Sequence, residues 1–560
     1  MEINKVTEET KNLIIKNIDF TYQTILENRG PAYVVLVSGN ADDEANWQLK
    51  IQEAAEYLFN ADGSCVVLSF EEKHKNKGKQ GNFFGTLLAY WKMETWAQKA
   101  GKHYKDRLVL VGMLFGRGER MSPFTQVEGD RKPAIEVNSH FMAPDKSIKV
   151  LSAIEEGLFG FVPVVRYLEE RGFRGFLDKW GDETEIPSID MTLIPENTQH
   201  YAQTDLIKII SPIIVTPELA AQKDFVLFNE KDDFIGMLPR APYDSMVQSF
   251  ESLGIKADNQ NRYTAGVSLG PVAMSYDLLQ FSLDFFRADI ETPGVILDFD
   301  PYFLMALSID DKALWEKITK NDENLKKLDQ LFNNFYQRIS QFKKAFEEKF
   351  RRPLKLKVLN LGEDIYWADI GQHQAMYDKY FSLLNDDALG EISRKLENLP
   401  GKRDENGNII ISSEIETGIE VRDSVLINSR LKGKGSVSNC VVKNSTIENP
   451  EMNQAFSISS VCVQGECVLQ RRSGLYKYLG KGGLVLKPYE RAGTLFTNDV
   501  PLSLKVHEKT DLRDRDNHYN KPILGNSISF SEAYDKSFGI SNEMIAKKRM
   551  VFLKQMEADE

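Results

Sequence analysis

The stretch from residue 409 to residue 449 reads IIISSEIETGIEVRDSVLINSRLKGKGSVSNCVVKNSTIEN. Aliphatic residues recur in it every six positions, in two phases: Ile409, Ile415, Val421 and Ile427, and then Ile419, Val425, Leu431 and Val437. A six-residue aliphatic period is typical of a parallel β-helix, in which each flat side of a triangular coil takes one hexad and turns its aliphatic residue inward. The pattern predicts such a domain over residues 405–470, with AFSISSVCVQGECVLQ as its last coil.

Upstream of this stretch, patterns of helices and strands alternate. The strand candidates AYVVLVSG and CVVLSF flank the amphipathic segment NWQLKIQEAAEYLF, an order that favours a parallel sheet. We expect residues 1–105 to form an α/β segment packed on, or part of, a catalytic domain at 106–400. The segment LWEKITKNDENLKKLDQLFNNFYQRISQFKKAFEEKF predicts one long amphipathic helix or two. Residues 471–560 form a C-terminal extension that ends in the helix candidate EMIAKKRMVFLKQM.

Composition limits the class of protein. A chain of 560 residues exceeds the size of one hydrophobic core, so we expect two or more domains. Its net charge of −12 argues against a surface that wraps nucleic acid. The four cysteines have no metal-type spacing, which favours reduced intracellular thiols. With no signal-peptide pattern and no long apolar run, we expect a cytoplasmic protein without a membrane-spanning helix.

The segment RLVLVGMLFGRGERMSPFTQ combines a short apolar strand with a glycine-rich loop, an order typical of ligand-binding sites in α/β proteins. Gly116 and Gly118 allow the backbone to direct its N–H groups onto a phosphate, and Arg120 and Lys132 add positive charge. The alternative is an ordinary turn. The same two interpretations apply to the basic stretch HKNKGKQGNFFGT at residues 74–86, which is either a phosphate-facing loop or a solvated turn.

This loop is similar to the nucleotide-binding signature of the sugar-phosphate nucleotidyltransferases, Gly-Gly-x-Gly-Thr-Arg-Leu-x-Pro-Leu-Thr followed by Lys-Pro. The residues that match in order are Gly116, Gly118, Arg120, Pro123, Thr125, Lys132 and Pro133. Two positions depart from the signature: Phe115 replaces the first glycine, and Glu119 stands where threonine or serine is usual. The resemblance implies a fold of class α/β, with a Rossmann-like mixed-sheet nucleotidyltransferase domain followed by a left-handed parallel β-helix.

The resemblance also assigns roles in this loop. It implies that Leu114, Gly116 and Gly118 bind the nucleotide and that Arg120 and Lys132 are catalytic. The order of the signature loop, the second motif described next and the repeats matches family members that carry a β-helix after the catalytic domain. Together these features cover roughly residues 107–470.

The second motif is YWADIG at residues 366–371, which resembles the family's Trp-x-Asp-x-Gly segment. The resemblance implies that Asp369 is a Mg²⁺ ligand, and Mg²⁺ prefers one or two carboxylates completed by phosphate oxygens and water. The alternative is that Asp369 caps the helix that follows it. The family's earlier metal-binding aspartate follows a glycine, and Gly181-Asp182 is the candidate here, with a solvated turn carboxylate as the alternative.

The sugar side of the site is less well marked. The family's Glu-Lys-Pro, whose lysine holds the sugar phosphate, is absent, and FIGMLPRAP offers Arg240 as a bidentate replacement. VSLGPVAMSYDLL resembles the strand and turn that line the family's sugar pocket, which makes Gly270 a candidate for close approach to the sugar.

The implied reaction joins a nucleoside triphosphate and a sugar 1-phosphate into a nucleotide-sugar and pyrophosphate, with Mg²⁺ as cofactor. One alternative is a regulatory or binding subunit of the same fold without turnover, which the altered signature positions permit. Another is a hexapeptide-repeat acyltransferase, but such enzymes use a histidine among the coils and none lies within these repeats. We expect any homo-oligomer to form through the β-helix or the C-terminal extension.

Overall fold

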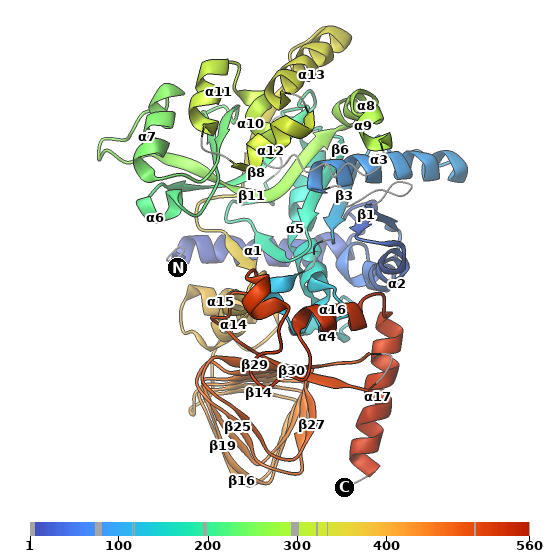
Figure 1. Ribbon diagram of the computed structural model, residues 1–560, viewed down its shortest axis with the longest axis vertical. Coiled ribbons are helices and arrows are strands. Elements are labelled where there is room, and N and C mark those ends of the chain that lie inside the picture. The colour runs from blue at the N-terminus through green and yellow to red at the C-terminus, as the bar shows by residue number, and fades with distance from the viewer. Residues whose placement is uncertain are drawn as a thin grey trace.

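The computed structural model describes residues 6–72, 81–114, 116, 118–193, 199–292, 302–320, 323–332, 334–497 and 500–558. The molecule is elongated, with an α/β part at one end and a stack of short strands at the other (Figure 1). The basic residues 74–80 and the altered signature residue Phe115 lie outside the described residues.

A nine-stranded mixed sheet forms the centre of the α/β part. Across the sheet its strands are β10 (Phe234–Leu238), β9 (Phe225–Phe228), β11 (Thr264–Ser275), β6 (Gly175–Trp180), β3 (Leu108–Met113), β1 (Tyr33–Ser38) and β2 (Val66–Glu71), while β8 (Leu206–Ile214) pairs with β11 and β12 (Leu356–Asn360) pairs with β8. Strands β2, β1, β3 and β6 are parallel, and β11 is antiparallel to β6. The α/β class is therefore confirmed, and the N-terminal residues belong to this sheet because β1 lies between β2 and β3.

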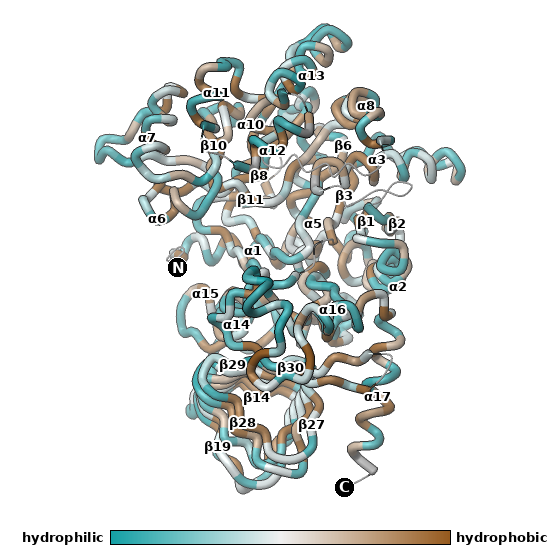
Figure 2. The backbone as a smooth tube through the Cα atoms, in the orientation of Figure 1, coloured by the Kyte–Doolittle hydropathy of each residue, from teal (hydrophilic) through white to brown (hydrophobic). Residues whose placement is uncertain are grey.

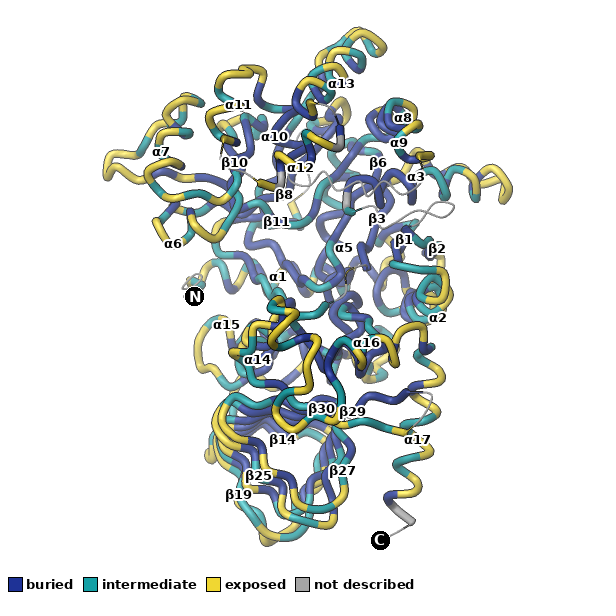
Figure 3. Tube along the Cα trace, in the orientation of Figure 1, coloured by how far each residue is buried: buried dark blue, intermediate teal, exposed yellow. Residues whose placement is uncertain are grey.

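Alternating side chains of the central strands point into two separate cores. In β1, Val34 and Leu36 enter one core, and Val35 and Val37 enter the other. The first core contains helices α1 (Glu8–Leu26), α2 (Ala41–Leu58) and α5 (Ala153–Glu170). The second contains α3 (Gly81–Ala100), α8 (Tyr276–Phe285), α10 (Tyr302–Ser308) and α13 (Phe335–Phe350). Figure 3 shows the buried strands between helices whose outer surfaces are exposed.

The segment expected to form one or two long helices forms three. They are α11 (Lys312–Thr319), α12 (Glu323–Phe332) and α13. Asn334 adopts a left-handed conformation with φ +76°, and its side chain caps α13. An asparagine at a left-handed position interrupts a helix at low cost, which explains the break within an otherwise continuous amphipathic pattern.

Shorter elements complete the α/β part and join it to the stacked strands. They are η1 (Glu119–Met121), α4 (Phe124–Val127), η2 (Lys132–Ala134), β4 (Glu136–Met142), β5 (Ile148–Ser152), β7 (Glu183–Ile186), α6 (Pro217–Ala220), α7 (Tyr243–Ser252), α9 (Arg287–Glu291), β13 (Tyr366–Asp369), α14 (His373–Phe381), η3 (Ser382–Leu384) and α15 (Ala388–Leu396). Helix α5 packs closely on β7 because Gly157 and Gly160 lack side chains. A Cβ at these positions would lie 2.5 Å from the Glu183 carbonyl oxygen and 2.9 Å from that of Glu185.

The C-terminal strands form three sheets. The first contains β14 (Ile409–Ile411), β17 (Val425–Ile427), β20 (Val441–Lys443), β23 (Phe456–Ile458), β26 (Gly474–Tyr476), β29 (Glu490–Leu495) and β30 (Leu502–His507). The second contains β15 (Glu414–Ile415), β18 (Arg430–Lys432), β21 (Thr446–Glu448), β24 (Val461–Val463) and β27 (Leu479–Lys481). The third contains β16 (Gly418–Arg422), β19 (Lys434–Ser438), β22 (Pro450–Asn453), β25 (Cys467–Leu469) and β28 (Leu484–Leu486). All these pairings are parallel except that of β29 with β30, an arrangement consistent with a parallel β-helix.

The repeat of these coils differs from the expected hexads. Three hexads would place equivalent residues of successive coils 18 positions apart. In the first coils they are 16 apart, because Ile409 pairs with Val425 and Val425 pairs with Val441. In later coils the separation is 15, between Val441 and Phe456, and then 18, between Phe456 and Gly474. Several corners are closed by Asn or Asp in the left-handed conformation, including Asp423, Asn428, Asn439 and Asn444. These corners shorten most sides to five residues. The strict six-residue spacing therefore does not persist around a coil, although the residues that stack do lie on the same side of successive coils.

The stack also continues beyond residue 470, through β26, β27 and β28. The interior of these later coils mixes residues of different size, so the aliphatic period fades. Figure 2 shows hydrophobic residues along the stacked strands and polar residues at many corners. After the stack come η4 (Arg515–Tyr519), α16 (Phe530–Ser537) and α17 (Asn542–Ala558), and α17 runs beside the coils (Figure 1). Of the helices in the described ranges, none has the length and apolar character needed to cross a bilayer.

Candidate functional site

The site lies beyond the carboxyl ends of two adjacent strands, β3 and β6, where Met113 is opposite Trp180. The Gly181 N–H donates to the Met113 carbonyl oxygen at 3.0 Å. A Cβ at Gly181 would lie 2.8 Å from that oxygen, so only glycine allows this close approach. Leu114 and Asp182 consequently begin their loops side by side, at the edge where ligands bind in open α/β sheets.

The signature loop folds back onto Lys132. Gly118 has φ +59°, and a Cβ there would lie 2.6 Å from Thr125 Cγ2 and 2.9 Å from Lys132 Cβ. Glycine is thus required for both conformation and space. Gly116 has φ +108°, is exposed, and among the described residues beyond its chain neighbours no atom lies within 4 Å of the position of a Cβ. The backbone at Gly116 is therefore open to an approaching anion, as expected for a phosphate-binding loop.

Four charged side chains expected from the sequence come together here. Lys132 Nζ forms an ion pair with Asp182 Oδ2. A Cβ at Gly371 would lie 2.8 Å from Asp369 Oδ1. The same point is 3.2 Å from Arg120 Nη2 and 3.4 Å from Asp182 Oδ2. We call Arg120, Lys132, Asp182 and Asp369 the charged cluster.

Asp369 is held by its own backbone turn. Its Oδ1 accepts a hydrogen bond from the Gly371 N–H at 2.7 Å, and the Ile370 N–H donates to the Asp182 carbonyl oxygen at 3.1 Å. Strand β13, which ends at Asp369, pairs with β7, which begins directly after Asp182. Helix α14 is preceded by Gln372 as its N-cap. Asp369 therefore does not cap that helix, and the strand pairing places it next to Asp182.

Burial raises the pKa of Asp369, and the neighbouring Asp182 carboxylate raises it further, whereas Lys132 and Arg120 lower it. A bound cation would relieve the repulsion between the two carboxylates. Mg²⁺ fits this donor set because it takes one or two protein carboxylates and completes its shell with phosphate oxygens and water. In the described ranges, no three His, Cys, Asp or Glu side chains gather as a metal-binding group.

Lys223 is a further basic residue near the charged cluster that sequence reasoning missed. Its Nζ lies 4.1 Å from the centroid of the Trp367 ring. Burial lowers the pKa of Lys223, and the Asp369 carboxylate opposes that effect. The Trp367 indole Nε1 is buried and has no hydrogen-bond partner among the described residues. No local motif marks Lys223, because the loop between α6 and β9 reads as an ordinary turn.

The two residues expected on the sugar side have different surroundings. The Arg240 side chain is 63% exposed and forms an ion pair with Asp224 at 3.3 Å. Gly270 lies in β11, where the pairing with β8 shifts register between Ser268 and Val272. A Cβ at Gly270 would lie 2.6 Å from the Trp180 ring, so this glycine permits close contact with the residue that ends β6.

The altered signature residue Glu119 has a partner far along the chain. Arg515 Nη2 in η4 donates to Glu119 Oε1 at 2.5 Å. The usual threonine or serine carries no charge for such an ion pair. The departure from the signature therefore goes together with a contact to the C-terminal extension.

No protein-family model matches this chain, and no curated protein sequence matches it significantly.

Proposed function

We propose that this chain transfers a nucleotidyl group from a nucleoside triphosphate to a sugar 1-phosphate and releases pyrophosphate. The observation that carries the proposal is the charged cluster, in which two cations and two carboxylates from distant places in the chain meet at the carboxyl edge of one sheet. A glycine-lined loop with accessible backbone lies beside it. This combination suits the binding of two phosphorylated substrates and a divalent cation.

The reaction needs positioning more than covalent chemistry. An oxygen of the sugar 1-phosphate attacks the α-phosphorus of the triphosphate, and the bond from that phosphorus to the bridging oxygen of pyrophosphate breaks. Both substrates are anions, so the protein must offset their repulsion and the charge that develops on the leaving group. Arg120 and Lys132 supply the positive charge, and the backbone around Gly116 and Gly118 receives the triphosphate.

Asp182 and Asp369 would hold Mg²⁺. When bound, the cation supplies positive charge that neutralises phosphate oxygens of the triphosphate. Lys132, which pairs with Asp182, then becomes available to a phosphate. The ion pair keeps both side chains directed toward the same space before substrates arrive.

On the sugar side we propose Lys223 as the main phosphate contact, because its ammonium is half-buried and close to Asp369. Gly270 lies against the Trp180 ring and leaves room for the sugar to approach the backbone there. Arg240 is the alternative phosphate ligand, although it would first have to leave Asp224.

The order of the α/β part and the stacked strands along the chain supports the same proposal. A mixed-sheet domain with the signature loop precedes stacked parallel strands, as in the nucleotidyltransferases that the sequence resembles. We include in the proposal that the α/β part is a nucleotidyltransferase domain and that the stacked strands wind into a left-handed β-helix.

Pyrophosphate release tests the proposal. The purified protein is assayed with Mg²⁺ over a matrix of the common nucleoside triphosphates against the 1-phosphates of glucose, mannose, galactose, fucose and N-acetylglucosamine. We expect release with one pair and its loss in Arg120→Ala and Asp369→Ala proteins that remain folded. Triphosphate binding without release from any pair would instead assign a nucleotide-binding subunit without turnover.

A further inference from the structure

The chain between α4 and Lys132 has an unusual conformation and an unusual partner. Gly129 and Asp130 are both left-handed, with φ of +63° and +65°. A Cβ at Gly129 would lie 2.5 Å from Arg131 Nη1 and 3.0 Å from the Ile540 carbonyl oxygen. This segment therefore leads directly into a residue of the charged cluster while it lies in contact with the C-terminal extension.

Arg131 joins three distant parts of the chain. The side chain is 1% exposed, and its Nε donates to Asp43 Oδ1 in α2 at 2.7 Å. Its Nη1 donates to the Ile540 carbonyl oxygen at 2.9 Å and to Asn542 Oδ1 at 3.2 Å. A planar guanidinium can satisfy these directions together, whereas a lysine ammonium cannot. Arg131 thus fixes the backbone directly before Lys132.

Further contacts extend from the same C-terminal segment. Ser537 Oγ donates to Asp130 Oδ2 at 2.8 Å. Arg549 Nη1 in α17 donates to the Lys477 carbonyl oxygen at 2.8 Å. Lys477 Nζ in turn forms an ion pair with Glu128 Oε1 at 2.7 Å. We call residues 537–549 the C-terminal anchor, because they contact Asp130 and Arg131 directly and are linked to Glu128 through Lys477.

We propose that the C-terminal anchor positions an active-site residue without touching substrate: Arg131 and Asn542 are positioning residues for Lys132. The proposal rests on the function inferred above only for the role of Lys132 in binding the triphosphate. The anchor holds the Arg131 side chain, and the backbone at Arg131 directs Lys132 toward Asp182. Displacement of a substrate-positioning group by about 1 Å can reduce the rate roughly a hundredfold, so these contacts matter although none touches substrate.

The position of the Lys132 amine can be measured without any substrate. Each lysine of the folded protein is acylated under limiting reagent, and the rate for Lys132 is read by mass spectrometry relative to the exposed Lys146. In the wild-type protein we expect the ion pair with Asp182 to slow this reaction. We expect Arg131→Met and Asn542→Ala to increase the relative rate several-fold, with the larger effect in Arg131→Met.

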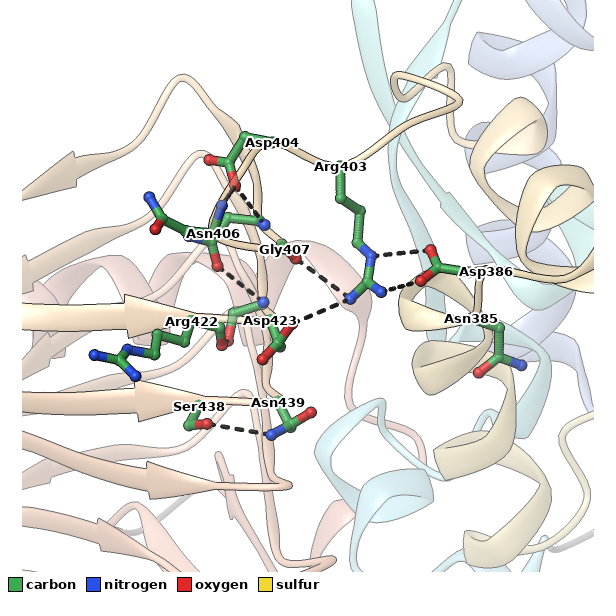
Figure 4. A network of polar contacts seen from close by, with 12 residues as sticks. Asn385, Asp386, Arg403, Asp404, Asn406, Gly407, Arg422, Asp423, Ser438 and Asn439 are labelled. Carbon is green, nitrogen blue, oxygen red and sulfur yellow. Dashed lines mark hydrogen bonds and ion pairs between the residues drawn. The ribbon is translucent and has the colours of Figure 1, made fainter.

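Arg403→Met is the matched control. Arg403 is also an arginine that joins separate parts of the chain: its Nε donates to Asp386 Oδ1 at 3.1 Å, and its Nη1 lies 3.8 Å from Asp423 Oδ1 (Figure 4). It contacts the first coil of the stack and none of the residues from 128 to 132. We expect its loss to leave the relative acylation rate of Lys132 unchanged.

Turnover provides the second measurement. With the substrate pair found above, Arg131→Met should lower kcat, in the same direction as loss of Lys132 itself, and kcat/KM should fall by up to about a hundredfold. Arg131→Lys should not restore it. An unchanged Lys132 acylation rate in both Arg131→Met and Asn542→Ala, or an equal increase in Arg403→Met, would overturn the proposal. If wild-type protein releases no pyrophosphate, the acylation result still decides whether the anchor positions Lys132.

Discussion

Lys132 forms an ion pair with Asp182, which lies 50 residues further along the chain. Because both side chains are about 15% exposed, the pair is accessible to a phosphate that could displace the carboxylate. We predict that Lys132→Met lowers kcat by roughly 10²–10³-fold, the usual effect of removing one group that stabilises developing charge. Pyrophosphate release measures it. Lys326→Met, which removes an exposed lysine on α12, is the control and should leave kcat unchanged.

Gly371 leaves the space into which Asp369, Arg120 and Asp182 converge. A methyl group in Gly371→Ala would lie 2.8 Å from Asp369 Oδ1, closer than side-chain atoms normally approach. We therefore expect the variant to remain folded and to lose most of its activity and its Mg²⁺ dependence. Gly401→Ala is the matched control, because no atom lies within 4 Å of its added Cβ. Equal activity of the two variants would show that the cluster tolerates displacement.

Lys223 and Arg240 are the two candidate ligands of the sugar phosphate, and substitution of each distinguishes them. A hydrogen bond to a charged group contributes roughly 1.5–3 kcal/mol, so the loss of the phosphate ligand should raise KM for the sugar 1-phosphate about ten- to a hundredfold. We expect this increase in Lys223→Met and not in Arg240→Met. KM for the triphosphate should change little in either variant. The reverse order would assign the phosphate to Arg240.

The sequence predicted the α/β class and the parallel stacking because both rest on local periodicity, as in AYVVLVSG and residues 409–449. It did not predict the coil repeat. Corner residues such as Asp423 and Asn439 adopt the left-handed conformation, and the aliphatic spacing alone does not reveal how many residues each corner takes. The break in the helix before α13 was not predicted for the same reason, since it depends on the conformation of Asn334.

The charged cluster could be expected from motifs, because Arg120, Lys132 and Asp369 each lie in a recognisable segment. Asp182 was the harder case, and its position follows from the strand pairing of β7 with β13. Lys223 could not be found in this way. Its electrostatic interaction with Asp369 joins residues far apart along the chain, and such long-range contacts leave no pattern in the local sequence.

The interior of the stacked coils offers a test of stability. Ile447 in β21 is fully buried and pairs with Leu431 and Cys462 in the neighbouring coils. Ile447→Ala should lower the free energy of unfolding by about 2–5 kcal/mol, because it leaves a cavity in a packed core. Val485→Ala on β28 is the control, since Val485 is 53% exposed and its truncation should cost less than about 0.5 kcal/mol. Chemical unfolding measures both.

His373 couples the stability of the protein to pH. It lies between the signature loop and the stacked strands, where its Nε2–H donates to the Ser122 carbonyl oxygen at 2.9 Å. Its Nδ1 is buried without a partner among the described residues. Burial, reinforced by the nearby Arg491, lowers the pKa of His373 from 6.5 to about 3. The folded protein therefore keeps this histidine neutral at pH values where the unfolded chain protonates it.

Protonation of His373 in the unfolded chain makes the protein less stable as pH falls. Between pH 6.5 and pH 3 the unfolded state binds the extra proton, so this group favours unfolding increasingly as pH falls. From about pH 7 to about pH 5 the wild-type protein should lose roughly 2 kcal/mol more of its free energy of unfolding than His373→Gln, whose amide can still donate to Ser122. His103→Gln removes a histidine with a 78% exposed side chain and should follow the wild-type curve. If wild type and His373→Gln lose stability in parallel, protonation of His373 does not limit the stability of the folded state.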